Sequence, residues 1–566
     1  MKQHPVKLSN FRPATVLVCG LIVISFRTNA STPESIAAEI RQLCADAPFA
    51  MTAPGVPQFP NQVFDIRVFG AVADGATLNT RAITEAIQAC KAAGGGTVFI
   101  PPGTWRTGPL ELLSNVQLRL ERGSLLLFSN RVEDFGMIPK PGDEGRKYVV
   151  APPLFASNAR NIAITGSGII DGAGERWRYV LREKQTERQW HELVAGGGIV
   201  SPDGKEWWPS RAAMEGQQYL ARLEKENPAP SKADYERARE YLRPDLVYLF
   251  RCEGILIDGP TFRNSPRYHI HPVQSENIII RNVIVQTDWF AMNGDGIDLS
   301  ACRNVVVYRA TLDVGDDGLC LKPASIGPQQ KPGPACANIL IADCVVYHAH
   351  GGFVIGSESY GGVRDISVRN CVFINTDAGI RFKSARGRGG DVERVFINRI
   401  QMRNILTEAI LLDMYYSGGS PEAESAKDRT VRTAESVTDR TPRFRDIDIR
   451  NVVCDGAARA VLINGLPELP IAGIRLDSLS IHARQGVTII DADSITLNQC
   501  SIQAIAGPIL TVNEGRQVTV NGGVWITPAG ASVRIEGPGS SAIRLLGISP
   551  AIEYGRGATS GSVVLQ

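Results

Sequence analysis

Short segments in which apolar and polar residues alternate recur along most of the 566-residue chain. They are NVQLRL from residue 115, NIAITG from 161, GILIDG from 254, NIIIRN from 277, NVVVYR from 304, NILIAD from 338, DISVRN from 365, RVFINR from 394, DIDIRN from 446, GIRLDS from 473, SITLNQ from 494 and QVTVNG from 517. Alternation with a period of two predicts β-strands that place Ile, Val and Leu on one side. Several successive segments start 27 residues apart, as from 277 to 304, and others start 21, 23, 29 or 34 residues apart.

The repeat predicts the architecture. A unit of about 20–35 residues built from strands and turns favours a solenoid, in which each coil buries its apolar side against the next. A β-propeller would repeat at about 40–45 residues, and a β-sandwich of this length with such regular spacing would be unusual. We therefore expect an all-β fold, a single right-handed parallel β-helix, in which equivalent residues of neighbouring coils stack about 4.8 Å apart.

Two segments interrupt the repeat. Residues 174–243 contain ERWRYVLREKQTERQWHELV and ADYERAREYL, which are charged and helix-forming, so a helical insertion is expected there. Such an insertion is either a solvated decoration or a wall that closes one end of a cleft. Residues 417–442 are rich in Ser, Glu and Thr and predict a loop.

The N-terminus follows the order of a secretory signal peptide. Lys2, Lys7 and Arg12 precede the apolar run ATVLVCGLIVISF, and small residues stand before Ser31. The run has 13 residues, which is short for a bilayer span, although a membrane anchor stays the alternative. We expect a signal peptide at 1–30, an N-terminal segment at 31–60 and the β-helix domain at 61–566, exported to the periplasm or secreted.

Composition narrows the choice of partners and of cross-links. Lys and Arg total 60 and Asp and Glu total 58, a formal net charge of +2 that gives no bulk attraction for a polyanion, so any basic site must be local. The 11 cysteines include Cys344, Cys371 and Cys500, each six residues into a repeat segment. This recurrence predicts a row of buried thiols rather than a disulfide framework. A single bridge, for example Cys320–Cys336, stays open.

Acidic residues gather in two neighbouring repeats. VGDDGLCLK (314–322) places Asp316 and Asp317 side by side, and NGDGIDLS (293–300) carries Asp295 and Asp298. Adjacent carboxylates in a half-buried strand are costly unless the protein uses them. Asp295 and Asp316 are 21 residues apart, about one coil, so we expect Asp295, Asp316 and Asp317 to share one face.

The next two repeats add histidines and cations. HAHGG (348–352) brings His348 and His350, and IRFKSARGRGG (380–390) brings Arg381, Lys383, Arg386 and Arg388. Crowded carboxylates hold a proton among them near neutral pH, which supplies an acid and a base for glycoside hydrolysis. An inverting enzyme needs about 6.5–9.5 Å between the two carboxyl groups, a range that neighbouring coils can provide. The basic residues predict a substrate that carries carboxylates.

Other interpretations of these residues stay open. An Asp-Asp pair by itself is typical of a solvated turn. The histidine pairs HIH (269–271) and HAH (348–350) could bind zinc, but no third cluster of ligands has a familiar spacing. The basic segment could attract nucleic acid, against which the lack of interleaved aromatic residues and the expected export argue.

At these residues the chain resembles glycoside hydrolase family 28, the polygalacturonase family of right-handed β-helices, and within it the bacterial exo-acting branch. Four family motifs stand in order, NGD (293–295), GDD (315–317), HG (350–351) and RFK (381–383). The stretch VFGAVADGATLNTRAITEAIQACKAAGGGTVFIPPGTW (68–105) is similar to the N-terminal coil of pectin-degrading β-helices. The resemblance covers roughly residues 60–550.

The resemblance implies a role for each matching position. Asp316 matches the general acid, Asp295 and Asp317 match the pair that activates water, and His350 matches a histidine that tunes the acid. Arg381 and Lys383 match the residues that hold a galacturonate carboxylate, and Asn293 matches an asparagine that positions substrate. Gly294 and Phe382 depart from the family motifs, but neither change removes a catalytic group.

Further substrate contacts are expected from His271, from Arg386 and from Tyr415 or Tyr416 of MYY, a choice that the sequence leaves open. The resemblance implies an inverting hydrolase of α-1,4-galacturonosyl linkages in pectin that acts from the chain end without metal or cofactor. The expected partner is an acidic polysaccharide, not nucleic acid and, beyond the signal peptide, not a membrane. Alternatives are a rhamnogalacturonan galacturonohydrolase, a pectate lyase or a glycan-binding β-helix without activity.

Overall fold

The computed structural model describes residues 32–143, 147–323, 325–326, 331–416, 432–528, 530 and 532–565. The expected signal peptide at 1–30 and the greater part of the expected loop at 417–442 lie outside these ranges. No helix among the described residues is long and apolar enough to cross a bilayer.

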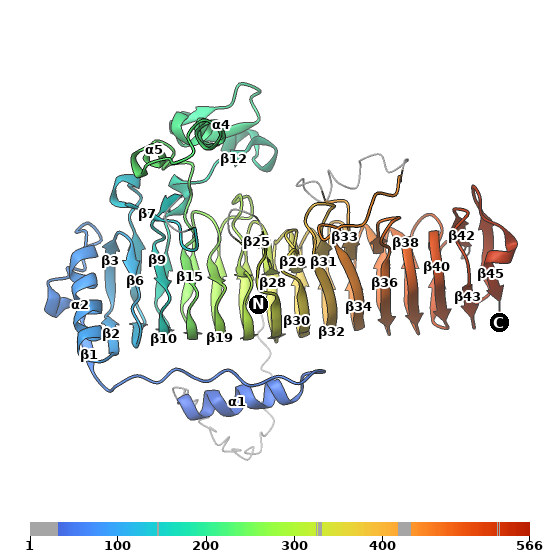
Figure 1. Ribbon diagram of the computed structural model, residues 1–566, viewed down its shortest axis with the longest axis horizontal. Coiled ribbons are helices and arrows are strands. Elements are labelled where there is room, and N and C mark those ends of the chain that lie inside the picture. The colour runs from blue at the N-terminus through green and yellow to red at the C-terminus, as the bar shows by residue number, and fades with distance from the viewer. Residues whose placement is uncertain are drawn as a thin grey trace, which may run out of the picture.

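The described strands build one long coil. Thirty-eight of them join into a single hydrogen-bonded parallel sheet that winds along the molecule from β1 (Val63–Asp65) to β45 (Val563–Leu565). Figure 1 shows these coils stacked side by side in chain order. The predicted all-β fold, a parallel β-helix, is confirmed, because each repeat segment pairs in register with the equivalent segment of the next coil.

One row of strands carries the acidic motifs, and we call it the site row. Its members pair in parallel in the order β9 (Leu154–Ser157), β15 (Val247–Phe250), β18 (Ile270–Val273), β21 (Ile297–Leu299), β24 (Asp317–Leu321), β29 (Gly351–Ile355), β31 (Ala378–Lys383), β33 (Glu408–Asp413) and β35 (Arg459–Asn464). Their inward residues, such as Ile297, Leu319 and Phe353, belong to the continuous core inside the coil.

A row of glycines fixes which side chains leave the core on the site row. A Cβ at Gly318 would lie 2.6 Å from Val346, and one at Gly352 would lie 2.3 Å from Phe373, each a core residue of the next coil. Each glycine is followed by another inward residue, Leu319 or Phe353, so two consecutive positions face the core. Gly296 and Gly379 occupy the equivalent positions of the flanking coils and meet Leu312 and Met402 in the same way. The interrupted alternation turns the residue before each glycine outward.

A second row of strands carries the repeat segments and is covered on its outer face. It runs through β10 (Arg160–Gly166), β16 (Glu253–Asp258), β19 (Glu276–Arg281), β22 (Arg303–Tyr308), β27 (Cys336–Ala342), β30 (Val363–Ile374), β32 (Asp391–Arg403) and β34 (Arg443–Asp455). In four coils the middle residue of the apolar triplet, Leu256, Ile279, Val306 and Leu340, packs outward against Ile36, Ile40 and Cys44 of α1 (Pro33–Ala45). Figure 1 shows α1 running beside these coils.

The triplets ILI, III, VVV and ILI therefore depart from simple alternation, because they place apolar residues on both faces of the strand. An apolar residue on both faces of a strand indicates that both faces are buried. Beyond Leu340 the middle position is no longer uniformly apolar, since it is Ser367 in β30, Phe396 in β32 and Asp448 in β34.

The cysteines are free thiols wherever the structure describes them. All ten, from Cys44 to Cys500, are buried and unbridged, so the bridge Cys320–Cys336 is absent. Cys344 and Cys371 stand on neighbouring coils next to the paired residues Val345 and Val372. They fill the core as small apolar residues, as the repeat position predicts.

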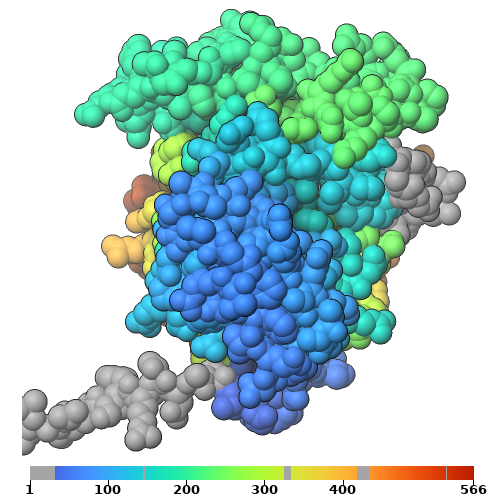
Figure 2. Space-filling view, turned by 90° about the vertical axis from the view of Figure 1, so that its left-hand side faces the viewer, coloured from blue at the N-terminus to red at the C-terminus, as the bar shows by residue number. Residues whose placement is uncertain are grey.

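Residues 174–243 leave the coil above the site row. This insertion contains α3 (Glu187–Ala195), α4 (Arg211–Glu226) and α5 (Lys232–Glu236), together with an antiparallel sheet of β12 (Val180–Leu181), β14 (Glu206–Trp208) and β13 (Ile199–Val200). Figure 2, which looks at the end of the molecule that α2 (Thr80–Ala92) closes, shows the insertion in green above the body of the coil.

The glycine row generates a prediction at Gly352. We expect Gly352→Ala to cost about 1–3 kcal/mol of stability, because its methyl group would overlap the ring of Phe373. Thermal or chemical unfolding measures this change. Gly136→Ala is the matched control, since a Cβ there meets nothing within 4 Å. Equal stability of the two variants would show that the coil accommodates an inward side chain at this position.

Candidate active site

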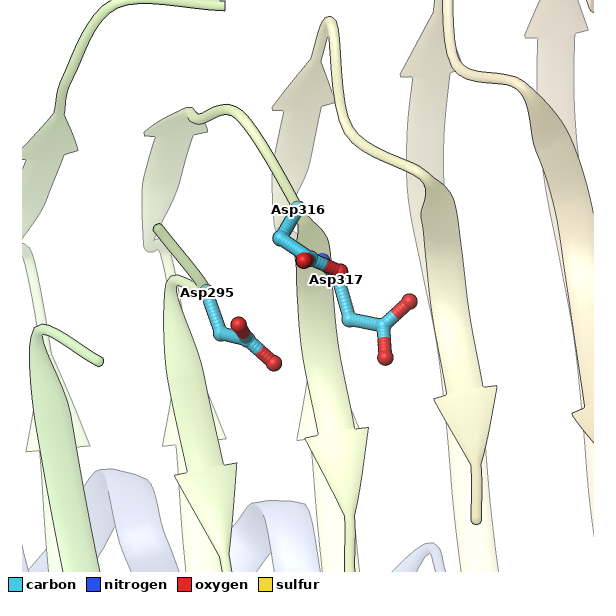
Figure 3. A group of neighbouring side chains, drawn as sticks. All are labelled: Asp295, Asp316 and Asp317. Atoms are coloured by element: carbon cyan, nitrogen blue, oxygen red, sulfur yellow. The ribbon is translucent and has the colours of Figure 1, made fainter. Parts of the chain in front are cut away.

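Three carboxylates converge on the outer side of the site row. One oxygen each of Asp295, Asp316 and Asp317 lies within 4.8 Å of the others. Figure 3 shows Asp295 just before its strand and Asp316 and Asp317 at the start of the neighbouring one. The register pairs Ile297 with Leu319, which sets Asp295 opposite Asp317. The coil is therefore 22 residues long here, not the expected 21. Asp316 precedes the residue that stands opposite Asp295 by one position.

Asp295 is held by a lysine that sequence reasoning missed. Lys322 donates to Asp295 Oδ2 and lies 2.6 Å from Asp298 Oδ1, while its ammonium stands 4.1 Å above the centre of the Tyr268 ring. The second oxygen of Asp295 is buried without a hydrogen-bond partner. Lys322 closes the stretch VGDDGLCLK, and its outward position two residues after Cys320 was the available signal.

The pKa of Asp295 lies well above its ordinary value. Burial is the main cause, and the neighbouring carboxylates of Asp298, Asp316 and Asp317 add to it, while Lys322 opposes them. Burial likewise raises the pKa of Asp298, again against Lys322. The surroundings of Asp295 and Asp298 therefore both favour the protonated carboxyl in the unliganded site.

Two cations of β31, two coils further along the chain, compensate the charge of Asp317. Lys383 Nζ donates to Asp317 Oδ2 at 2.8 Å, and Arg381 Nη1 lies 3.7 Å from Asp317 Oδ1. Burial raises the pKa of Asp317, but Lys383, Lys322 and Arg381 outweigh it and hold the pKa below its ordinary value. Arg381 and Lys383 therefore join the triad, as the sequence predicts.

Tyr416 lies with these two cations. Its ring centre is 5.6 Å from the Arg381 guanidinium carbon and 5.1 Å from Lys383 Nζ. Tyr415 instead contacts Arg386, at 5.6 Å. Of the two tyrosines that the sequence left open, Tyr416 is the one beside the triad.

Asp316 is the most accessible of the three acids. Its side chain is 15% exposed, against 2% for Asp295 and Asp317. Its Oδ1 accepts from the Asp317 backbone N–H at 2.9 Å and lies 3.1 Å from His350 Nδ1. Burial raises the pKa of Asp316, but His350 and Lys383 outweigh it and hold the pKa well below its ordinary value. In the unliganded site this direction is opposite to the one a general acid needs.

His350 connects the triad to the insertion. Its Nε2 lies 3.2 Å from Lys184 Nζ and 3.7 Å from Asp377 Oδ2. Lys184 ends η4 (Arg182–Lys184) inside the insertion, 166 positions earlier in the chain. No spacing in the sequence relates these two residues, so sequence reasoning missed Lys184.

Asn293 is held by the far end of the same insertion. Arg243 donates to Asn293 Oδ1 at 2.7 Å and to the Met292 carbonyl at 2.9 Å. Its guanidinium lies over the ring of Tyr179, which stacks on Trp208 with centres 4.4 Å apart. The insertion thus contacts the motif residues from both of its ends.

Two predicted substrate contacts are engaged within the protein. His271 Nδ1 lies 2.6 Å from Asp245 Oδ2, and its Nε2 lies 2.9 Å from Ser300 Oγ, so both ring nitrogens have protein partners. Arg386 forms a bidentate pair with Glu468 at 2.6 and 2.8 Å. Arg386, Glu468 and Tyr415 therefore form a cluster of their own, separate from the triad.

The zinc alternative finds no geometric support among the described residues. His269 Nδ1 lies 2.8 Å from the Asp295 carbonyl and His348 Nδ1 lies 3.0 Å from Asp313. The histidines of HIH and HAH thus serve separate partners. The acid triad is the one group of three or more potential ligands within the described ranges that is close enough for a metal ion. Lys322 and Lys383 already neutralise part of its charge.

Comparison with known proteins agrees with the motifs. The model of the family "Glycosyl hydrolases family 28" matches residues 186–441, and that of "Rhamnogalacturonase A/epimerase, pectate lyase-like" matches residues 63–187. An exo-poly-alpha-D-galacturonosidase of Dickeya chrysanthemi is 29% identical over 426 residues. The match covers 73% of this chain and 65% of that protein, slightly less than two thirds of its length.

Solved structures agree as well. An exopolygalacturonase of Thermotoga maritima superposes with a TM-score of 0.61 at 25% identity, covering 86% of this chain and 96% of that one. A family 28 exopolygalacturonase of Yersinia enterocolitica shares the fold, with a TM-score of 0.63 at 22% identity over 81% of this chain and 78% of that one. With the four motifs meeting on neighbouring coils, these matches show that the chain is similar to glycoside hydrolases of family 28, with the family model itself matching residues 186–441.

Proposed function

We propose that this protein hydrolyses α-1,4-galacturonosyl linkages of polygalacturonate from the chain end, with inversion at the anomeric carbon. The observation that carries the proposal is the contact of the acid triad with Arg381 and Lys383 of β31. An arginine and a lysine beside the reacting groups suit a sugar that carries a carboxylate. The activities for which the Dickeya and Thermotoga relatives are named point to the same substrate class.

Asp316 is the proposed general acid, because it is the triad member that solvent reaches best. It donates its proton to the glycosidic oxygen as the bond from that oxygen to the anomeric carbon breaks. Water attacks the opposite side of the same carbon and gives up a proton to Asp295 or Asp317. Each of these two carboxylates has one buried oxygen, Oδ1, without a hydrogen-bond partner, which suits a water held between them.

The short distances in the triad correct one expectation. Its nearest oxygens lie within 4.8 Å, below the range of about 6.5–9.5 Å that inverting enzymes usually show between carboxyl groups. Two bases on adjacent coils that share one water can account for the closer packing. Each base binds its lysine, Lys322 or Lys383, through Oδ2 and keeps Oδ1 for that water.

The proton must move within the triad before the reaction. The unliganded site raises the pKa of Asp295 and lowers that of Asp316, whereas the proposed roles require Asp295 ionised and Asp316 protonated. One oxygen of each acid lies within 4.8 Å of the others, so a bridging water carries the proton between them, and their titration is coupled. A substrate carboxylate that engages Arg381 and Lys383 weakens their pull on the acids and so favours a proton on Asp316.

Action from the chain end and export complete the proposal. The insertion contacts Asn293 and His350 and stands above the site row, where it can bar a polymer from passing through. Cleavage of an extracellular polymer agrees with the signal-peptide pattern at residues 1–30.

Product analysis on polygalacturonate tests the substrate and the direction of attack. We expect monomeric or dimeric galacturonate from the earliest times, in the presence of EDTA and without ultraviolet absorbance from unsaturated ends. A ladder of oligomers would contradict action from the chain end, and unsaturated products would indicate a lyase. Release from rhamnogalacturonan oligosaccharides alone would move the substrate to that backbone. Proton NMR of the first product gives its anomeric configuration, and retention would rule out inversion.

Replacing the proposed acid tests the mechanism. We expect Asp316→Asn to lower kcat by about 10²–10⁴-fold, the usual contribution of general acid catalysis. The matched control is Asp313→Asn, whose 44% exposed side chain pairs with His348 outside the triad. Near-wild-type turnover of Asp316→Asn would exclude it as the acid and would leave Asp295 as the candidate.

Lys322 provides a pH-dependent prediction. Lys322→Met removes the cation that lowers the pKa of Asp295, so this pKa rises further. Because Asp295 must be ionised to act as a base, we expect the ascending limb of the pH–activity profile to move to higher pH. The variant should also lose about 3–5 kcal/mol of stability, since it leaves buried carboxylates unpaired. An unshifted limb in a folded variant would contradict the proposed role of Asp295, and Lys205→Met is the exposed control.

A further inference from the structure

We propose that Lys184 of the insertion is a positioning residue, which keeps His350 neutral with its proton on Nδ1 and thereby directs the catalytic proton to Asp316. This inference rests on the proposed hydrolytic function. It gives the insertion a part in the chemistry in addition to its part in shaping access to the site.

The contact between the two side chains defines the tautomer. Lys184 Nζ lies 3.2 Å from His350 Nε2. An ammonium group has three donors and no acceptor, so Nε2 must offer its lone pair. A neutral imidazole then carries its one proton on Nδ1, which lies 3.1 Å from Asp316 Oδ1 and donates to it.

Within the described ranges, three charged groups face His350, each from a different element. Asp316 precedes β24 and faces Nδ1, while Lys184 of η4 and Asp377, which precedes β31, both face Nε2. Asp377 Oδ2 is 3.7 Å away, beyond hydrogen-bond distance. A protonated ring would have to donate from Nε2 toward Asp377 and would meet the like charge of Lys184. Lys184 therefore opposes the imidazolium state.

The location of the proton decides whether the site can react. Once the proton has been transferred within the triad, Asp316 and His350 form a pair in which it rests on either partner. A charged His350 lowers the pKa of Asp316, which leaves the proposed acid without its proton. By opposing charge on the ring, Lys184 favours the arrangement with the proton on Asp316, where it can reach the glycosidic oxygen.

The insertion holds Lys184 in place over the site. The Arg182 backbone N–H donates to the Lys205 carbonyl at 2.8 Å. This bond extends the antiparallel pairing of β12 with β14 toward Lys184. The side chain of Gln185 donates to the Lys184 carbonyl at 2.9 Å. Lys184 is partly buried, unlike exposed lysines of the insertion such as Lys225. Its ammonium is therefore a fixed feature of the site rather than a freely moving surface charge.

Nitrogen NMR of the wild-type protein tests the tautomer without any reaction. Histidine-labelled protein has seven imidazoles, and His350→Gln assigns the signals of His350 by their loss. At the pH of highest activity we expect a protonated Nδ1 and an unprotonated Nε2. A protonated Nε2, alone or together with Nδ1, would overturn the proposal.

Kinetics of three variants test the consequence for the acid. We expect Lys184→Met to lower kcat about tenfold, because the proton then rests more often on His350. Loss of the cation also strengthens the hold of the pair on its proton, so the descending limb of the kcat–pH profile moves to higher pH. Lys184→Arg keeps the charge and the donors and should keep the limb in place, and Lys225→Met should behave as wild type.

The outcomes separate this inference from the proposed function. If wild type releases galacturonate and Lys184→Met keeps the wild-type kcat and descending limb, Lys184 has no positioning role and the hydrolytic function stands. A rise in KM alone, with kcat and the limb unchanged, would also overturn the proposal, since it would make Lys184 only a binding residue. If wild type itself leaves polygalacturonate intact, the proposed function fails, whereas the nitrogen NMR result still decides the tautomer.

Discussion

The parallel pairing of backbone from coil to coil is the constraint on which the rest of this structure depends. It stacks Ile297, Leu319, Phe353 and Ile380 on four successive coils. These residues are 22, 34 and 27 positions apart in the chain. The same pairing carries Asp295, Asp317, His350 and Arg381 to one surface without a local motif that contains them all. The coils differ in length because turns absorb the extra residues while the strands keep their register. The site is therefore as rigid as the stack of strands below it.

Charge compensation decides how the acids can stand so close together. Two buried lysines, Lys322 and Lys383, approach the triad from opposite sides and bind Asp295 and Asp317. A buried carboxylate without such a partner would be strongly destabilising. Compensation is nevertheless uneven, since Asp295 shares Lys322 with Asp298 whereas Asp317 faces both Lys383 and Arg381. This asymmetry separates the pKa values of chemically identical side chains, which is what an acid and a base made from the same residue type require.

The insertion at 174–243 is coupled to the site by polar contacts at both of its ends. Arg243 holds Asn293, and Lys184 reaches His350. The two interpretations open at the level of sequence were a solvated decoration and a wall. Direct contact with motif residues argues against simple decoration. It also explains why a charged, helix-forming segment would be placed above a coil that is otherwise continuous.

Periodicity in the sequence was enough to determine the fold and the motif residues of the site. Alternating apolar residues at a coil-length spacing specify strands that must stack, and the ordered motifs name Asp295, Asp316, Asp317, His350, Arg381 and Lys383, which the structure brings together. The apolar triplets over α1 also stood in the sequence, although alternation alone did not indicate what covers them.

Only the tertiary structure decided the remainder. The register of the strands placed Asp295 opposite Asp317. The folded chain put Tyr416, and not Tyr415, next to Arg381 and Lys383. In the folded protein His271 contacts Asp245, and Arg386 forms an ion pair with Glu468. Lys184 joined the site across 166 positions of chain. Sequence periodicity reports on neighbours within a strand and between successive coils, whereas the partner of a buried charge is fixed by three-dimensional proximity, which no regular spacing encodes.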